Sequence, residues 1–171
     1  MVTVFLGMGS NLGDRLGFLR LGLEALARGG LRIDRVSAVV ETPAVGYEAQ
    51  PPFLNLVAAC GWEGGAEALL TLIRRVEAEA DRIRPFRNAP RTLDVDLIFF
   101  GDLIIRSPGL RVPHPRWKER SFVVRPLQQL APGFSDPETG FTVDEVRRKW
   151  QQKPEKVEEV VQMNDLSWIS P

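Results

Sequence analysis

Two apolar segments rich in β-branched residues follow one another with only a loop between them, and this arrangement strongly constrains the fold. Residues 31–41 form the first segment and residues 53–60 the second. The connection, Thr42 to Pro52, shows no helical repeat and ends in two prolines. Strands joined in this way pair antiparallel, because a parallel pair needs a crossover of about a dozen residues or more, usually a helix.

The remaining pattern places this pair inside a longer alternation of strands and helices. Apolar periodicity and turn residues predict the other elements at residues 2–6 (strand), 15–27 (helix), 66–81 (helix), 93–100 (strand) and 103–105 (a short edge strand). The order β-α-β-β-α-β predicts a ferredoxin-like α+β sandwich in which helices cover one sheet face. Additional C-terminal helices are expected at 121–130 and up to Trp150, the last capped by Thr142.

Length and charge limit the protein class. The 171 residues suit one domain, predicted at 1–150, followed by a polar tail at 151–171 with no assigned role. Lys+Arg and Asp+Glu both number 22, which does not favour a nucleic-acid or membrane-surface protein. Cys60 is the only cysteine, and neither a leader nor a membrane-length apolar run is present. A cytoplasmic, monomeric protein is expected.

Two aspartates interrupt the apolar strand that ends at Phe100. Side chains alternate along a strand, so Asp94 and Asp96 point to the same face and share one small volume. Their mutual repulsion is relieved by a cation, and hard oxygen ligands on a rigid strand suit magnesium. The alternative is an exposed face on which the aspartates pair with arginines.

Basic residues flank this strand on both sides. The preceding loop supplies Arg82, Arg84, Arg87 and Arg91, which outnumber the two acids and leave donors for phosphate oxygens. Arg116, Lys118 and Arg120 follow the strand at a short distance. A polyphosphate bound with magnesium would satisfy both the acids and the bases.

Two further residues admit a structural and a functional interpretation. Glu77 falls within the apolar arc of its predicted helix, so its carboxylate either reaches solvent at the end of the stripe or points at the site. His114 is the only histidine and lies between Pro113 and Pro115. A lone histidine is often structural, but loops of this kind also position ligand contacts.

The glycines after the first strand do not form a known nucleotide-binding motif. Their spacing in 7–13 is G-x-G-x-x-x-G, one residue longer than the dinucleotide fingerprint, and no P-loop motif occurs. Any bound nucleoside triphosphate must therefore be held by side chains.

Several motifs in fixed order carry a family resemblance. The most specific are Pro90-Arg-Thr-Leu-Asp-Val-Asp96 and Val112-Pro-His114, and the others are Gly9-Ser-Asn-Leu12, Thr42-Pro43, Pro52-Phe-Leu-Asn55 and Glu77 to Arg84. Together, from about Val2 to Trp150, they resemble the 6-hydroxymethyl-7,8-dihydropterin pyrophosphokinases. The resemblance implies a ferredoxin-like enzyme of folate biosynthesis that transfers pyrophosphate from ATP to the pterin hydroxymethyl oxygen and releases AMP.

The resemblance also implies roles for individual residues. Two magnesium ions would be bound by Asp94 and Asp96, with Arg82 and Arg91 acting on the phosphates near the reacting centre. The residues implied to hold ATP are Glu77, which would also support the metal region, Arg84, His114 and Arg120. The residues implied to contact the pterin are Phe53 and Phe122, which would stack on it, Asn55, which would read its polar edge, and Thr42, Pro43 and Val45.

Three positions depart from the family pattern, namely Asn88, Gly109 and Pro115, and Arg111 is a candidate substitute for a basic residue at position 109. The alternative from another class is a ferredoxin-like RNA-binding module. Such a module needs exposed aromatics and a basic sheet face, where the two aspartates would repel phosphates.

Overall fold

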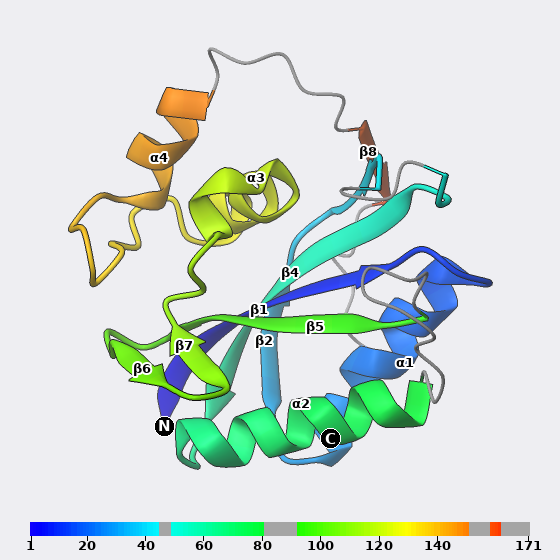
Figure 1. Ribbon diagram of the computed structural model, residues 1–171, viewed down its shortest axis with the longest axis horizontal. Helices are drawn as coiled ribbons and strands as arrows, with labels where there is room; N and C mark the ends of the chain where they lie inside the picture. Colours follow the sequence, from blue (N-terminus) through cyan, green and yellow to red (C-terminus); the bar gives the residue numbers. More distant parts are fainter. Residues whose placement is uncertain (45–48, 81–91, 151–157, 162–171) are drawn as a thin grey trace.

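A six-stranded antiparallel sheet forms the centre of the protein (Figure 1). The computed structural model describes the chain except residues 45–48, 81–91, 151–157 and 162–171. The strands are β1 (Val2–Ser10), β2 (Arg32–Val36), β3 (Val39–Thr42), β4 (Phe53–Trp62), β5 (Asp94–Phe100) and β8 (Glu158–Val161). Their order is β5-β1-β4-β3-β8, with β2 also paired to β4. This arrangement confirms the predicted ferredoxin-like α+β class.

The segment predicted as one strand at 31–41 is divided into β2 and β3, which pair with successive parts of β4. The division lies at Ser37 and Ala38. The Ser37 hydroxyl accepts a hydrogen bond from Val57 N at 2.9 Å. The Ala38 N–H instead donates to the side-chain oxygen of Gln129 at 3.0 Å. Gln129 belongs to the helix formed by Ser121–Leu130. Ser37 N still donates to Val57 O at 2.9 Å, and side-chain hydrogen bonds take the place of further ladder bonds on either side of it.

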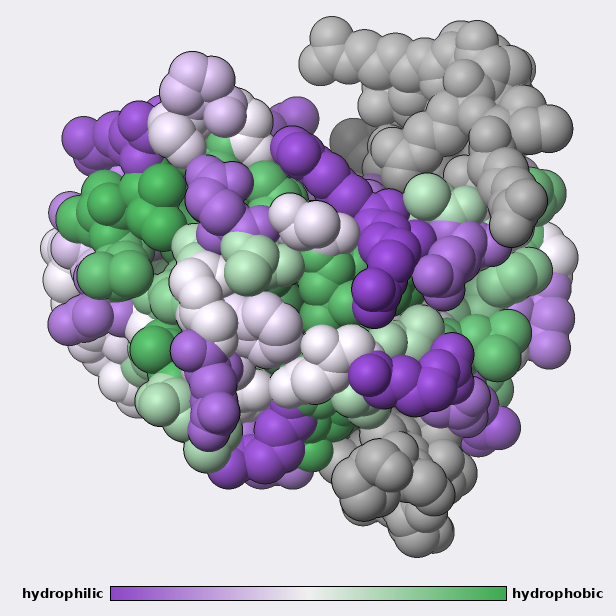
Figure 2. Space-filling view, turned by 90° about the horizontal axis from the view of Figure 1, so that it is seen from below, coloured by the Kyte–Doolittle hydropathy of each residue, from purple (hydrophilic) through white to green (hydrophobic). Residues whose placement is uncertain are grey.

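Helices α1 (Arg15–Arg28) and α2 (Ala66–Ala80) cover one face of the sheet. The Asp14 carboxylate caps α1 by accepting a hydrogen bond from Gly17 N at 3.0 Å. The helix ends before Gly30, whose φ of 95° suits glycine. The core buried between these two helices and the sheet includes Leu6, Leu23 and Ile73. Figure 2, seen from the α2 side, shows hydrophilic residues dispersed among hydrophobic ones on the surface.

Helices α3 (Ser121–Leu130) and α4 (Val143–Trp150) cover the opposite face, so helices lie on both sides of the sheet rather than one. A second core forms there around Phe99, Trp117 and Leu127. Thr142 caps α4 as expected: its hydroxyl accepts from Glu145 N at 3.2 Å, and the Glu145 carboxylate accepts from Thr142 N at 2.7 Å. The C-terminal helices therefore complete the fold by covering the face that α1 and α2 leave bare.

The segment after β5 differs from the expected edge strand at 103–105. It forms a separate hairpin of β6 (Ile105–Ser107) and β7 (Leu110–Val112), followed by the cis Val112–Pro113 bond and the short 3-10 helix η1 (Trp117–Glu119). In the tail, β8 pairs antiparallel with β3. Within the described part of the chain, no helix has the length and apolar character needed to cross a membrane.

Candidate active site

The two aspartates of β5 lie on the sheet face that α3 covers. Both are half-buried, and they alternate with Val95 and Leu97, which are buried in the core beneath α1 and α2. Ile98, two residues after Asp96, belongs to the core on the α3 side. The side-chain alternation of a strand therefore directs both carboxylates to the α3 side.

Glycines on the neighbouring strand lie opposite the aspartates. In the β1–β5 ladder Gly7 pairs with Asp96 and Gly9 with Asp94. A Cβ atom at Gly9 would lie 2.8 Å from Asn55 Oδ1, and one at Gly7 would lie 3.3 Å from Ile98 Cδ1. The sequence interpretation missed this role, although antiparallel pairing of the G-x-G and D-x-D segments would have indicated it. The glycines keep the sheet face beside the carboxylates free of side chains.

A basic group and an imidazole converge on Asp96. Arg120, just before α3, donates from Nη1 to Asp96 Oδ2 at 2.7 Å. The Nε2 atom of His114 lies 3.8 Å from the same oxygen. His114 is itself held by its backbone N–H, which donates to Ile98 O on β5 at 2.9 Å. The structure thus brings together three residues that the sequence implicated separately.

The ring of His114 is biased towards its neutral form. Burial lowers its pKa, the Asp96 carboxylate opposes this effect, and Arg120 and Arg116 reinforce it. The Nδ1 atom accepts a hydrogen bond from Arg116 N at 3.1 Å. In the neutral ring the proton therefore lies on Nε2, the nitrogen that faces Asp96. His114 can act there as a neutral hydrogen-bond donor to an anion.

Glu77 on α2 is held against the edge of β5. It is half-buried, and its Oε1 atom accepts a hydrogen bond from Val95 N at 2.8 Å. Val95 lies between the two aspartates in the sequence, so this contact ties α2 to the strand at the level of the site. The carboxylate of Glu77 therefore does not simply extend into solvent but binds the backbone of the strand that carries both aspartates.

The residues expected to contact a pterin lie on β3, β4 and α3. The Nδ2 atom of Asn55 donates to Thr42 Oγ1 at 2.9 Å, and both residues are buried. Phe53 is half-buried, with Cδ1 at 3.4 Å from the Cβ position of Gly9. Phe122, in the first turn of α3, lies with its ring centroid 5.8 Å from the Arg120 guanidinium carbon. Pro43 is exposed just after β3.

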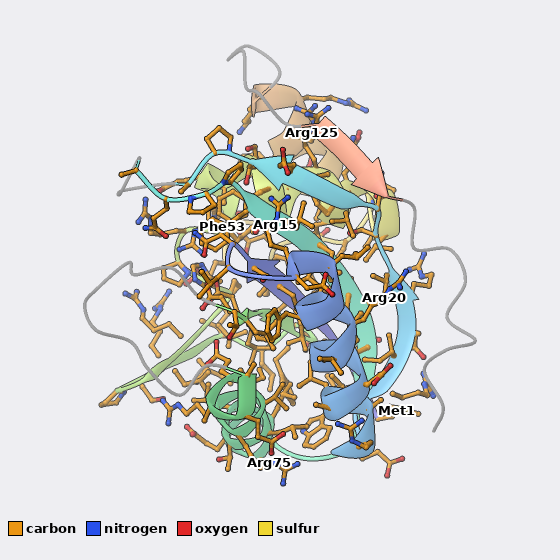
Figure 3. The ribbon with its side chains drawn as sticks, turned by 90° about the vertical axis from the view of Figure 1, so that its right-hand side faces the viewer. Met1, Arg15, Arg20, Phe53, Arg75 and Arg125 are labelled. Atoms are coloured by element: carbon orange, nitrogen blue, oxygen red, sulfur yellow. The ribbon has the colours of Figure 1, made fainter. Side chains whose placement is uncertain are left out.

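The start of β4, where Phe53 lies, is held by hydrogen bonds from the N-terminal end of α1. Arg15 Nη1 donates to Pro52 O and to Glu41 Oε2, each at 2.9 Å. Figure 3 shows Arg15 and Phe53 next to each other, near the middle of the view. Asn11 Nδ2 donates to the side chain of Gln50 at 2.8 Å. These bracing residues were not identified from the sequence, since no local pattern links residues so far apart in the chain.

Four of the expected site residues lie outside the described part of the chain: Val45, Arg82, Arg84 and Arg91. Among the residues that are described, no group of three or more His, Cys, Asp or Glu side chains could hold a metal ion. The donor set at the site is thus the carboxylate pair of Asp94 and Asp96. Such a pair suits Mg²⁺, which commonly takes one or two protein carboxylates and completes its shell with water and substrate phosphates.

Sequence comparisons connect this chain to known proteins. Residues 5–132 match the family described as 7,8-dihydro-6-hydroxymethylpterin-pyrophosphokinase (HPPK). The 2-amino-4-hydroxy-6-hydroxymethyldihydropteridine pyrophosphokinase of Aquifex aeolicus is 39% identical over 137 residues, covering 80% of this chain and 85% of that protein. The Bacillus subtilis protein of the same name is 36% identical over 151 residues, covering 87% and 90%.

Other matches are larger proteins. The folic acid synthesis protein fol1 of Pneumocystis carinii is 34% identical, and the match covers 82% of this chain but 19% of that protein. Among solved structures, Plasmodium falciparum HPPK-DHPS with SDX-DHP has a TM-score of 0.68 at 15% identity, covering 88% of this chain and 44% of that chain. At this level of identity the structural likeness shows the fold alone, and this chain spans less than half of the solved one.

Proposed function

This chain belongs to the 7,8-dihydro-6-hydroxymethylpterin-pyrophosphokinase family, and we infer that it transfers a pyrophosphoryl group from ATP to 6-hydroxymethyl-7,8-dihydropterin in folate biosynthesis. The geometry that best supports this activity is the row of Asp94, Gly9 and Asn55 across three adjacent strands. This row puts the carboxylate of Asp94 and the buried amide of Asn55 on one sheet face with only a glycine between them, and Asp96 lies two residues further along β5 on the same face.

In this reaction the hydroxymethyl oxygen attacks the β-phosphorus of ATP. A new O–P bond forms, the bond between the β-phosphorus and the oxygen of AMP breaks, and the hydroxyl proton is released. The protein has little covalent chemistry to perform, so alignment of the substrates and stabilisation of charge carry the rate. Among the described residues, the charged and polar groups at this face suit those two tasks.

Asp94 and Asp96 are the residues that would hold magnesium, with two ions expected. Bound there, magnesium would supply neutralisation of phosphate charge and activation of the attacking oxygen. The remaining tasks fall to the chain itself. Arg120 and His114 lie beside Asp96, and a guanidinium and a neutral imidazole N–H are both suitable donors to phosphate oxygens. Glu77 would keep β5 in place beneath them.

The pterin would lie over Gly9 and beside Asn55. Because Asn55 directs its Nδ2 to Thr42, its amide orientation is set, and Oδ1 lies close to Gly9 as an acceptor for a pterin N–H group. Phe53 and Phe122 would stack on the flat heterocycle from β4 and α3. Pro43 and Val45 would add contacts from the loop after β3. Arg82, Arg84 and Arg91 are proposed to act on the phosphates, as the family resemblance implies.

We test this function by incubating the purified chain with ATP, the hydroxymethyl dihydropterin and Mg²⁺, and separating the products by chromatography. The expected result is one AMP for each pterin diphosphate. Release of ADP in place of AMP would show single phosphoryl transfer, and no product would overturn the proposal. A monomeric state and a cytoplasmic location are also proposed, and sedimentation of the purified chain tests the first.

A further inference from the structure

A short connection carries both of the groups that converge on Asp96. His114 and Arg120 are the two ends of a seven-residue segment, 114–120, whose only regular element is the 3-10 helix η1. Both ends must be held in place for the imidazole and the guanidinium to reach the same carboxylate oxygen. Because the segment has so little secondary structure, its position depends on tertiary contacts.

Three contacts hold this segment. At its start, His114 N donates to Ile98 O at 2.9 Å. In its middle, Trp117 is buried, with its ring centroid 5.1 Å from that of Phe99. Near its end, Lys118 Nζ donates to Asp136 Oδ2 at 2.8 Å. The contact of Lys118 with Asp136 is the closest of the three to Arg120 in sequence. It is polar, whereas the contact of Trp117 with Phe99 is apolar.

Asp136 is fixed more firmly than an ordinary surface acid. Its side chain is fully buried (0% exposed), whereas that of Lys118 is 33% exposed. Besides Lys118, the carboxylate accepts from Glu138 N at 2.9 Å and from Thr139 Oγ1 at 3.0 Å. The loop around it is closed by Gly140 N, which donates to Asp136 O at 2.7 Å. This loop connects α3 to α4 (Figure 1). Because these hydrogen bonds hold the Asp136 carboxylate in one position, it is a rigid partner for Lys118.

Such a pair contributes less to stability than its burial suggests. Taking a carboxylate out of water carries a desolvation cost that the attraction to its partner often only offsets, and buried ion pairs can frequently be replaced by apolar residues without loss. An ion pair does, however, fix the position of one segment relative to another, because the ammonium group with its three donors must stay beside the held carboxylate. The expected contribution of Lys118 and Asp136 is therefore to the position of the segment.

We propose that the ion pair of Lys118 and Asp136 is a positioning pair for ATP binding, which holds the backbone before α3 so that Arg120 stays beside Asp96. Neither residue touches the substrates in this scheme. The inference rests on the proposed function, because it assigns Arg120 to the phosphates. Lys118 precedes Arg120 by two residues, so it shares a short stretch of backbone with it. Arg120 itself is fixed at both of its backbone groups, because Arg120 N donates to Trp117 O at 3.3 Å and Arg120 O accepts from Val124 N of α3 at 2.9 Å.

The proposal predicts an unequal effect on the two substrates. Of the residues proposed to contact the pterin, Phe53 and Asn55 lie on β4, outside the 114–120 segment, whereas Phe122 follows that segment in α3. Loss of the pair should therefore weaken binding of a non-hydrolysable ATP analogue by about tenfold, the lower end of the losses seen when an outer-shell partner of a metal ligand is removed. Binding of the pterin should change less than binding of the analogue, because only Phe122 among its proposed contacts lies next to the segment.

The test uses Asp136→Asn, which preserves the size of the side chain and an acceptor for Glu138 N but removes the charge. Lys118→Gln is the reciprocal variant, and it leaves Asp136 its two donors from the loop. Lys118→Arg retains a cation and should restore analogue affinity to near the wild-type value. Titration calorimetry with the ATP analogue and with the pterin, each measured separately, gives the two dissociation constants.

The matched control is Val146→Ala, which removes buried volume from α4 in the same core and leaves both members of the ion pair in place. Analogue affinities are compared between variants whose melting temperatures are lowered by similar amounts. If Val146→Ala weakened analogue binding as much as Asp136→Asn, the pair would be merely structural and the inference would be overturned. Should Asp136→Asn not fold, Lys118→Gln decides the question in the same way. Failure of the proposed function itself would appear separately, as absence of AMP release by the wild-type chain.

Discussion

Asp94 and Asn55 occupy the same row of the central sheet and are separated only by Gly9, which pairs with both of them. Neighbouring strands lie about 4.8 Å apart, so the backbones of the two residues are about 10 Å apart. That distance accommodates a bicyclic heterocycle with its hydroxymethyl group directed to the carboxylates. In the proposed function, this row would set the boundary between the bound pterin and the phosphates of ATP.

Gly9→Ala should weaken pterin binding selectively. The new Cβ atom would lie 2.8 Å from Asn55 Oδ1, so Asn55 must turn away from its place beside Thr42. We expect a loss of pterin affinity of about tenfold, the equivalent of one good hydrogen bond, with little change for ATP. Gly133→Ala is the control, because nothing lies within 4 Å of its Cβ position. Equal affinities for wild type and Gly9→Ala in a fluorescence titration would contradict the proposed pterin position.

Asp94→Asn and Asp96→Asn should each lower turnover on the order of a hundredfold or more, the scale seen when one stabilising group is removed from a transition state. The amides keep the shape of the carboxylates but lose the charge that would hold magnesium. Both side chains are half-buried at the site rather than in a core, so the fold should be retained. Single-turnover rates across a magnesium titration, with circular dichroism as the control, provide the measurement. Near-normal rates at saturating magnesium would exclude the metal assignment.

Phe53→Ala and Phe122→Ala should both weaken pterin binding, but they should differ towards ATP. Among the residues that the structure describes, Phe122 lies close to a cation proposed to bind the phosphates, with its ring 5.8 Å from the Arg120 guanidinium. Loss of that contact costs about 0.5–1 kcal/mol at a partly exposed site, so Phe122→Ala should also bind ATP several-fold more weakly. Affinities measured for each ligand alone test this difference. An ATP defect in Phe53→Ala as large as that in Phe122→Ala would speak against it.

Stability should depend on pH through His114. Burial lowers its pKa in the folded protein, whereas the unfolded value is about 6.5. Between these two values the unfolded chain binds more protons than the folded one. The free energy of unfolding should therefore fall as the pH is lowered from about 6.5 towards the folded-state pKa.

His114 is the only histidine, so no other imidazole contributes to this effect. Urea unfolding at pH values from 7.5 to 5 in wild type and His114→Gln provides the measurement, with the pH range chosen around the imidazole pKa of about 6.5. The variant should show a flatter dependence. An unchanged slope would assign the effect to carboxylates instead.

The local pattern of the sequence determined much of the fold. Helix α3 was expected at residues 121–130 and is found at Ser121–Leu130, because its apolar spacing and its position after a proline-rich turn are properties of neighbouring residues. The shared face of Asp94 and Asp96 also follows from alternation along one strand. The assignment of the family rested in the same way on short contiguous motifs.

Only the tertiary structure decided which distant residues meet. The pairing of Gly7 and Gly9 with the aspartates, the contact of Glu77 with Val95, and the ion pair of Lys118 with Asp136 each join segments that no local pattern relates. The split between β2 and β3 has the same origin, since the Ala38 N–H finds its acceptor on Gln129 of α3. Backbone propensity and periodicity act over a few residues, whereas these contacts depend on how the layers pack.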